Sequence, residues 1–393
     1  MLKEGFHDID YNDVWERSVG IGVLGYGFMG KVHSNAYLKI PSVYETVTAF
    51  PELFAMCGRN REKVEGTAVR FGYKGYYTNW RRLVEDPEVE IVDNCTPDNL
   101  HCEPSIAAAR NGKHIICEKP LSMTVGEARS MVEAVQEAGV KHMCCYNYRF
   151  VPAVRLAKRI IDRGLLGRIY QFRACYLQEV GHDPEEVVEN VWYTSGTRSG
   201  VLLGIGCHII DMARFLVGEI VTVSGMLKTF NKKRKSSSGG LEDVVADEAN
   251  IALVEFEGGA LGTLESSGVS SGRKNRHTWE INGSKGSIAF DLEDLNHLHV
   301  HLPDFSAEGV EGFTNVSATG ITYSPGTVIL PPGHNAGWEY GHVHALAHFL
   351  DCVVNNKPVE PLGASFEDGY RVQVIMEAIA ESSRTGDRIT IKY

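Results

Sequence analysis

The sequence predicts an α/β protein with an N-terminal parallel sheet and a C-terminal α+β unit that contains a large, open, mainly antiparallel sheet. Three observations support this class. A strand, a glycine turn and a helix follow one another near the start; strands alternate with helices as far as residue 146; and short alternating runs dominate from residue 169 onward. We therefore expect an arm over 1–18, a first domain over 19–146 and a second domain over 147–393.

The first domain begins with a short, β-branched apolar run at 19–24, which ends in Gly25-Tyr26-Gly27-Phe28-Met29-Gly30. A helical pattern follows over 31–38. Later runs repeat this alternation, which implies a parallel sheet with right-handed crossovers. They predict strands at 53–57, 91–95, 114–117 and 142–146, and helices at 61–71, 80–85, 104–111 and 125–138.

The second domain opens with a helix over 154–163 that Gly164 ends. Turn signals such as Glu257-Gly258-Gly259 separate the runs that follow, as in an antiparallel sheet. A helix over 209–217 is expected to cover one face of this sheet, a last helix spans 366–383, and 303–332 is expected to be loop. The predicted strands are 169–176, 221–230, 248–256, 260–266, 278–282, 287–291, 298–302 and 389–391.

Composition excludes several classes of protein. Lys and Arg number 39 against 50 Asp and Glu, so a nucleic-acid binder is disfavoured. The basic run 232–235 precedes serines and glycines and is expected to be a solvated loop. No membrane span or secretory signal is recognised. The nine cysteines are odd in number and lack Cys-x-x-Cys spacing, which favours reduced thiols in the cytoplasm over disulfides or a zinc finger.

The glycine turn carries the first functional signal. Gly25 permits the tight turn, Gly27 lets a pyrophosphate approach the backbone, and Gly30 allows close packing of helix on strand. The helix N-terminus then offers N–H groups to the anion. The sequence therefore predicts a dinucleotide site; the alternative is a glycine turn in a flavodoxin-like sheet without cofactor.

Five motifs, in order, resemble those of the glucose–fructose oxidoreductase/inositol dehydrogenase/MocA family. They are Gly25 to His33, Thr96 to His101, Glu118-Lys119-Pro120, Tyr146 to Phe150 and Gly206 to Asp211. The resemblance spans nearly the whole chain, and within the family it points to the branch of levoglucosan and glucoside 3-dehydrogenases. It implies an N-terminal Rossmann domain and NAD(P)-dependent oxidation of a sugar or polyol carbinol.

Oxidation of an alcohol needs a base for the hydroxyl proton and a cation for the developing alkoxide. Lys119 follows a predicted parallel strand, at the edge where such sheets bind ligands. The resemblance makes it the catalytic lysine, and it makes His208 the general acid/base. Asp211 lies three residues later and is expected either to orient this imidazole or to cap the helix.

One position departs from the family pattern. The family usually carries Asp four residues before the catalytic histidine, and here that position is Gly204. Glycine cannot accept a side-chain hydrogen bond from substrate or polarise a lysine. Another carboxylate replaces it, or the chemistry is slowed, or the sequence was altered at this position.

The expected cofactor is NAD or NADP. No acidic residue ends the second strand, where Arg59 could hold a 2′-phosphate or stack on adenine and Asn60 could bind the ribose hydroxyls. The resemblance and the glycine turn together give the expected cofactor-binding set: Gly25, Gly27, Phe28, Met29, Gly30, Arg59, Asn60, Thr96, Pro97, Asn99, His101, Glu118, Lys119 and Asn147.

The substrate site is expected to combine aromatic and polar side chains, as sugar sites do. Tyr176 and Gln178 share one face of a strand because they are two residues apart. The full expected set is Tyr148, Arg149, Tyr176, Gln178, Trp192, Arg198 and His208.

Two histidine groups do not suggest a metal. His297, His299 and His301 share a strand face, and His342, His344 and His348 lie on a helix, but neither group has an adjoining cysteine or carboxylate cluster. The expected partners are a small sugar or polyol and further copies of the chain, as a homodimer or homotetramer, because an open sheet exposes a broad face. A non-catalytic NAD(P)-binding sensor, or an enzyme that recycles tightly bound cofactor internally, is the alternative function.

Overall fold

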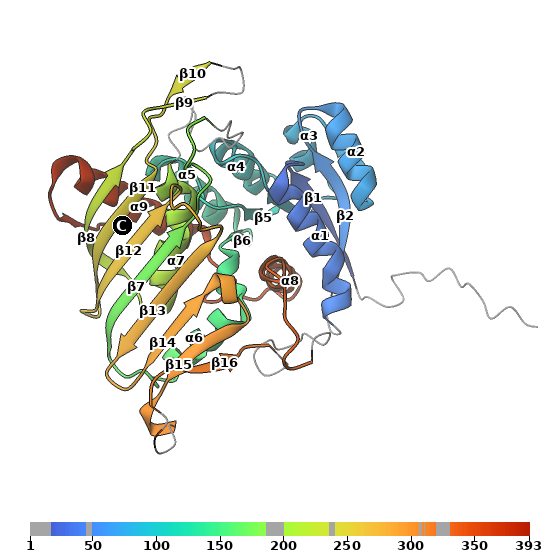
Figure 1. The fold of residues 1–393 in the computed structure, drawn as a ribbon. Coiled ribbons are helices and arrows are strands. Elements are labelled where there is room, and N and C mark those ends of the chain that lie inside the picture. The colour runs from blue at the N-terminus through green and yellow to red at the C-terminus, as the bar shows by residue number, and fades with distance from the viewer. Residues whose placement is uncertain are drawn as a thin grey trace, which may run out of the picture.

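The computed structural model describes residues 17–44, 49–185, 200–235, 240–305, 309, 311–319 and 331–393. Figure 1 shows an N-terminal α/β unit beside a large curved sheet. The expected arm, apart from its last two residues, and the candidate substrate residues Trp192 and Arg198 lie outside the described residues.

The N-terminal sheet is parallel throughout, in the order β3-β2-β1-β4-β5-β6. The order reverses between β1 and β4, and ligands bind at the carboxyl ends of the strands beside such a reversal. The strands are β1 (Ser18–Leu24), β2 (Phe50–Cys57), β3 (Gly75–Tyr77), β4 (Ile91–Asn94), β5 (His114–Cys117) and β6 (His142–Cys144); the helices are α1 (Phe28–Val43), α2 (Arg61–Phe71), α3 (Trp80–Glu85), α4 (Cys102–Arg110) and α5 (Val125–Ala138).

The ends of these helices follow from local residues. The side chain of Asn60 caps α2 by accepting from the N–H of Lys63, and Thr124 caps α5 by accepting from the N–H of Glu127. Gly72 and Gly139 end the same two helices in the left-handed conformation. Predicted elements of this half are confirmed, with β3 added.

The second sheet has nine strands in the order β16-β15-β14-β13-β7-β12-β11-β8-β17. It is antiparallel except for the pair β7–β12, which is parallel, so the predicted fold class is confirmed. A separate hairpin joins β9 and β10. The strands are β7 (Ile169–Leu177), β8 (Ile220–Lys228), β9 (Lys233–Lys235), β10 (Leu241–Asp243), β11 (Ala249–Phe256), β12 (Leu261–Ser267), β13 (Arg276–Gly283), β14 (Ser287–Asp291), β15 (His297–His301), β16 (Thr314–Ser317) and β17 (Ile389–Thr390).

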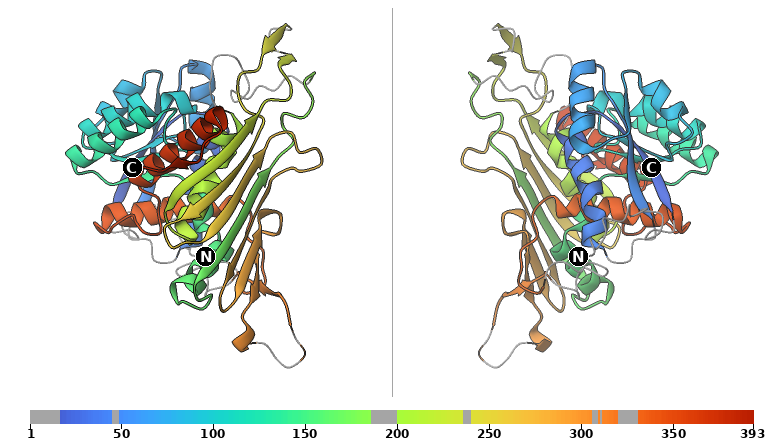
Figure 2. Two further views of the ribbon diagram at one scale, coloured as in Figure 1. Left: turned by 90° about the vertical axis from the view of Figure 1, so that its left-hand side faces the viewer. Right: turned by 90° about the vertical axis from the view of Figure 1, so that its right-hand side faces the viewer.

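Helices cover one face of this sheet only. Figure 2 shows α6 (Pro152–Asp162), α7 (Cys207–Leu216) and α9 (Phe366–Thr385) on that face and no helix on the other face of the described sheet. The remaining helix, α8 (Tyr340–Val354), packs against α1. Its Val343 and Leu346 share a buried core with Ile21 and Ile40. This late helix therefore stabilises the N-terminal unit.

Two expectations about loops were wrong. The expected loop over 303–332 contains β16, which pairs with β15. The basic run, expected to be a solvated loop, forms β9, and Arg234 within it is buried, with Nη2 2.8 Å from Glu248 Oε1. Both errors have one cause, because pairing with a neighbouring strand, which their own sequence pattern does not show, makes these short runs strands. Within the described residues, no helix has the length and apolar character needed to cross a membrane.

Candidate active site

The glycine turn between β1 and α1 has the geometry that a dinucleotide needs. Gly25 has a positive φ of 100°, and a Cβ there would lie 2.6 Å from the carbonyl oxygen of Cys95. A Cβ on Gly30 would lie 2.0 Å from the carbonyl oxygen of Gly25. Gly27, in contrast, has nothing within 4 Å of its Cβ position. Only glycine fits at 25 and 30, and Gly27 leaves space for a phosphate above the start of α1.

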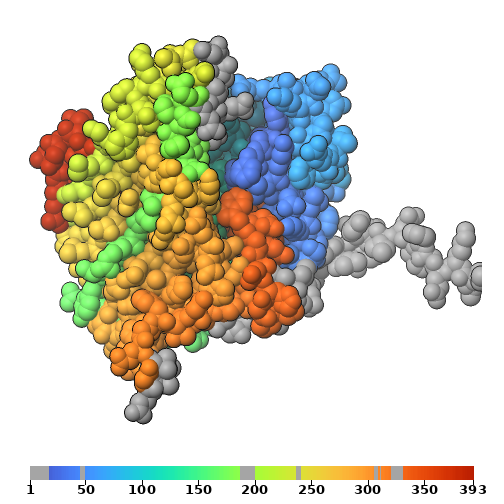
Figure 3. All heavy atoms as spheres, viewed as in Figure 1, coloured from blue at the N-terminus to red at the C-terminus, as the bar shows by residue number. Residues whose placement is uncertain are grey.

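A cavity of about 560 Å³ lies directly beyond this turn, at the carboxyl ends of β1, β2, β4 and β5. Figure 3 shows a hollow between the N-terminal unit and the large sheet. The predicted cofactor residues that line the cavity are Gly25, Gly27, Phe28, Met29, Arg59, Thr96, Pro97, His101, Glu118 and Lys119. The residues present therefore fit a dinucleotide.

Four predicted cofactor residues do not line this cavity. Gly30 packs helix on strand, and Asn60 is engaged as the cap of α2. Asn99 lies in a single 3₁₀ turn, and Asn147 is buried with its Nδ2 unpartnered among the described residues. The structure adds Tyr26, Thr78 and Trp80 to the lining. Sequence reasoning missed Thr78 and Trp80 because β3, which leads to them, carries no recognisable pattern.

Lys119 lines the cavity, and His208 lies near enough to feel the charge of its side chain. Lys119 follows β5, and its Nζ donates to the carbonyl oxygen of Gly204, 3.0 Å away. Gly204 lies in the π-helical turn Leu202–Gly206, which leads directly into α7 and places His208 in the first turn. Burial lowers the pKa of His208 well below its usual value, and the positive charge of Lys119 lowers it further. The imidazole is therefore neutral at physiological pH and ready to accept a proton.

A chain of hydroxyl and amide groups lies beside His208. Tyr148 and Tyr176 share a hydrogen bond of 2.8 Å between their hydroxyls, and Tyr176 and Gln178 both donate to Asn275 Oδ1 at 2.8 Å. The rings of Tyr148 and His208 lie 4.6 Å apart between centroids. The structure thus brings together three of the predicted substrate residues around the predicted base.

Three residues of this region were missed by sequence reasoning. Asn275 precedes β13, and His277 on β13 stacks on Tyr176 with ring centroids 5.0 Å apart. Trp338 donates from Nε1 to the Tyr148 hydroxyl at 3.3 Å and stacks on Phe28 with ring centroids 6.1 Å apart. Asn275 and His277 reach this region because β13 pairs with β7, about a hundred residues earlier in the chain. No local sequence pattern predicts this pairing.

Arg149 and Asp211 bind each other instead of facing the pocket. Arg149 Nη2 and Nε donate to the two carboxylate oxygens of Asp211 at 2.6 and 2.9 Å, and both side chains are buried. Arg149 Nη1 lies 3.3 Å from Asp368 Oδ2, and the guanidinium lies over the ring of Phe215. Asp211 sits within α7 rather than at its cap, and the described bonds direct it to Arg149 rather than to His208. Both side chains therefore stabilise α7. The sequence had instead led us to expect that Arg149 binds substrate and that Asp211 orients His208 or caps the helix.

Most histidines of the two groups considered for metal have other partners. His297 pairs with Asp294, His301 faces the carbonyl oxygen of Gly312, His344 bonds Tyr44, and His348 bonds the carbonyl oxygen of Val359. His342 is the exception, because it faces Glu118 and His33 across the interior.

The cavity fits a dinucleotide and is lined by Lys119, and a neutral histidine with a row of hydroxyl-bonding groups lies beyond that lysine; this arrangement is typical of a nicotinamide-dependent oxidoreductase. The comparisons agree: residues 19–146 match the model described as the oxidoreductase family with NAD-binding Rossmann fold, and residues 154–289 match the GFO/IDH/MocA C-terminal domain. The chain belongs to the GFO/IDH/MocA family and is an NAD-dependent oxidoreductase of CH–OH groups.

Similar proteins include the levoglucosan dehydrogenase of Pseudarthrobacter phenanthrenivorans, 37% identical over 93% of this chain and 96% of that protein. The scyllo-inositol 2-dehydrogenase (NAD⁺) of Bacillus subtilis is 28% identical over 87% of this chain and 88% of its own. A solved levoglucosan dehydrogenase in complex with NADH and levoglucosan superposes with a TM-score of 0.90 at 35% identity, covering 96% of this chain and 100% of that chain.

Proposed function

We propose that this enzyme oxidises a secondary hydroxyl of a sugar, glycoside, anhydrosugar or inositol, with anhydrosugars such as levoglucosan the first substrates to try. The observation that carries the proposal is the bond from Lys119, which lines the cofactor cavity, to the turn that leads into His208, and the hydroxyl-binding chain of Tyr148, Tyr176, Asn275 and Gln178 beside that histidine. The similarity to levoglucosan dehydrogenase supports the choice of substrate.

His208 and Lys119 have different roles in the proposed reaction. Neutral His208 accepts the proton of the substrate hydroxyl, and the Lys119 ammonium stabilises the negative charge that develops on the same oxygen. When bound, the nicotinamide dinucleotide supplies the acceptor for the hydride. Burial of His208 among Tyr146, Tyr148 and Tyr176 excludes water from the proton transfer.

The first experiment is a substrate panel. The purified enzyme is incubated with NAD or NADP separately and with levoglucosan, glucosides, aldoses and inositols, and the absorbance of reduced nicotinamide is followed. We expect reduction with one sugar class. No reduction, with nucleotide released on denaturation, would support internal recycling; no reduction and no bound nucleotide would support the sensor.

Matched variants then test the roles. Lys119→Met and His208→Asn are each expected to lower kcat by at least about 100-fold. The control Lys74→Met, at an exposed pair with Glu52, should leave kcat unchanged. Full activity of Lys119→Met would refute the role given to the lysine.

We also propose that the chain forms a homodimer or homotetramer through the helix-free face of the large sheet. Met226, Ile251, Leu253 and Leu261 on this face are each more than half exposed, although they are apolar. Light scattering tests it, with Leu253→Lys expected to release smaller species. The cytoplasm is the proposed location, because the nine cysteines are free thiols.

A further inference from the structure

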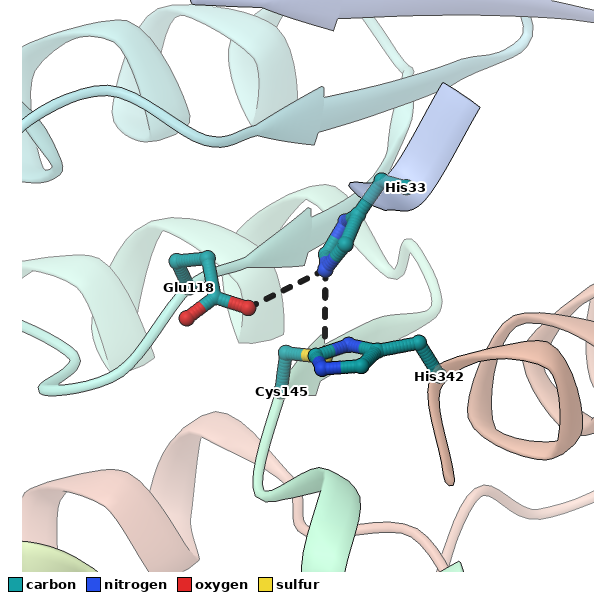
Figure 4. A group of neighbouring side chains, drawn as sticks. All are labelled: His33, Glu118, Cys145 and His342. Carbon is teal, nitrogen blue, oxygen red and sulfur yellow. Dashed lines mark hydrogen bonds and ion pairs between the residues drawn. The ribbon is translucent and has the colours of Figure 1, made fainter. Parts of the chain in front are cut away.

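Four side chains that the proposed reaction does not use converge inside the protein. His33 comes from α1, Glu118 follows β5, Cys145 follows β6, and His342 lies in the first turn of α8 (Figure 4). All four are buried, with at most 4% of any of them exposed. Each offers one nitrogen, oxygen or sulfur atom, and these four atoms lie within 4.8 Å of one another.

The spacing of these atoms matches a tetrahedral metal site. His33 Nε2 lies 3.1 Å from Glu118 Oε1 and 3.7 Å from Cys145 Sγ, and that sulfur lies 4.0 Å from His342 Nδ1. Zinc bonds of about 2.0 Å to nitrogen or oxygen and 2.3 Å to sulfur, at tetrahedral angles, separate ligand atoms by roughly 3.3–3.6 Å. The other three pairs of these atoms lie within 4.8 Å, so side-chain movements of up to about one ångström would close the coordination sphere.

An outer partner already orients one of the imidazoles. Both carboxylate oxygens of Asp93 lie 2.9–3.0 Å from His33 Nδ1, on the side of the ring away from Glu118. A carboxylate on the far nitrogen is the arrangement that fixes metal-binding histidines and raises their basicity. It presents Nε2 to the centre of the cluster.

His342 supplies an independent observation. Its Nε2 is buried and has no hydrogen-bond partner among the described residues, and Nδ1 has only the 4.0 Å contact with sulfur. A buried imidazole without a partner is costly, because it has given up its hydrogen bonds to water. A bond from Nδ1 to a metal ion would replace the long contact with sulfur by a strong interaction.

We propose that His33, Glu118, Cys145 and His342 form a binding site for a zinc-type divalent ion. Two imidazoles, a thiolate and a carboxylate suit zinc, whereas magnesium and calcium prefer oxygen ligands alone. Four protein ligands leave no open position, so the ion is structural and fastens α8 to α1 and to the carboxyl edge of the parallel sheet. Glu118 also lines the cofactor cavity, which gives the ion an entry path.

The alternative to a metal ion is a proton on His33, which the imidazole shares between Asp93 and Glu118. To distinguish zinc from this proton, untagged enzyme is produced with zinc, dialysed against metal-free buffer and analysed for its metal content. We expect about one zinc per chain. After replacement by Co²⁺, the thiolate-to-cobalt absorption and the visible bands of tetrahedral cobalt should appear.

Matched variants locate the ion. Cys145→Ser should abolish the thiolate-to-cobalt absorption, and Cys144→Ser, at the neighbouring buried cysteine, should keep it. His342→Gln should weaken zinc binding at least about 100-fold, and His344→Gln, two residues along α8, should not.

Wild-type enzyme alone can overturn the proposal, so a variant that fails to fold does not leave the question open. Enzyme that retains no zinc, shows no cobalt spectrum and has the same unfolding temperature with and without added Zn²⁺ holds only the shared proton. Dehydrogenase activity is not part of this test, so its failure is distinct from failure of the proposed function.

Discussion

Lys119 Nζ donates to the backbone carbonyl of Gly204 at 3.0 Å. This bond joins the carboxyl end of β5 to the turn that positions His208, so the cation and the base are held relative to each other by the main chain. One partner of the ammonium is a neutral oxygen at the position where the family resemblance leads one to expect a carboxylate.

Restoring the carboxylate tests this relationship. Gly204→Asp is expected to raise kcat about tenfold, because a carboxylate beside Lys119 can orient the ammonium and accept from a substrate hydroxyl. Gly204 lies in helical backbone and needs no positive φ. Steady-state kinetics on the best substrate of the panel measures the effect. A variant with unchanged or lower kcat would mean that Gly204 is not a missing catalytic position.

Arg59 is expected to set cofactor preference. It lies exposed after β2 at the edge of the cavity, and no acidic residue stands beside it at the strand end. Arg59→Ala should raise the KM for NADP at least about tenfold more than the KM for NAD, because only NADP offers a 2′-phosphate for a guanidinium. Arg82→Ala, outside the cavity lining, is the control. Equal rises in both constants would assign Arg59 to adenine stacking.

The Arg149–Asp211 pair is expected to govern stability rather than substrate binding. Arg149→Met leaves the buried carboxylate of Asp211 without its main partner and should cost about 3–5 kcal/mol of unfolding free energy. The double variant Arg149→Met, Asp211→Leu should recover part of this loss, since it removes both charges. Urea unfolding measures the free energies. A large rise in substrate KM without loss of stability would restore Arg149 to the substrate site.

Asp247 is expected to make stability depend on pH. Burial raises its pKa to about 6, although its Oδ2 accepts from the N–H of Leu202 and from Asn250 Nδ2. The folded chain keeps this proton up to pH 6, and the unfolded chain loses it near pH 4, so stability falls as pH rises from about 4 to 6.

Asp247→Asn removes this titration and keeps an acceptor oxygen. The variant should be about 1–2 kcal/mol more stable than wild type at pH 7.5, and the difference should vanish near pH 4. Urea unfolding at a series of pH values measures it, with the exposed Asp243→Asn as control. Stability curves that run parallel across the whole pH range would show that Asp247 is ionised throughout in the folded protein.

The parts of the fold predicted correctly are those with a local cause. The turn from Gly25 to Gly30 needs only the adjacent strand and helix, and the bounds predicted for the helices at 61–71 and 125–138 are fixed by residues within one turn of chain. The family resemblance singled out Lys119 and His208 because each lies in a compact motif, at the end of a strand or the start of a helix, and their catalytic roles remain predictions.

The parts that could not be predicted depend on distant pairing. β16 and β9 become strands only because β15 and β10 lie beside them. Asn275 reaches Tyr176 through the pairing of β13 with β7, and Arg149 turns inward because α7 and α9 bring Asp211 and Asp368 to it. The last two outcomes depend on contacts between segments far apart in sequence, and the first two depend on pairing with a neighbouring strand that the local pattern does not show.

The stacking of Trp338 on Phe28 gives the enzyme a built-in optical reporter. Phe28 and Trp80 both line the cavity, so of the five tryptophans one borders the space for the nucleotide and a second, Trp338, stacks on a residue that borders it. Indole emission overlaps the absorption of reduced nicotinamide. Binding of the reduced cofactor should therefore quench tryptophan fluorescence by energy transfer, and replacing Trp338 with Phe should remove part of that signal, so cofactor exchange can be timed in the unlabelled enzyme.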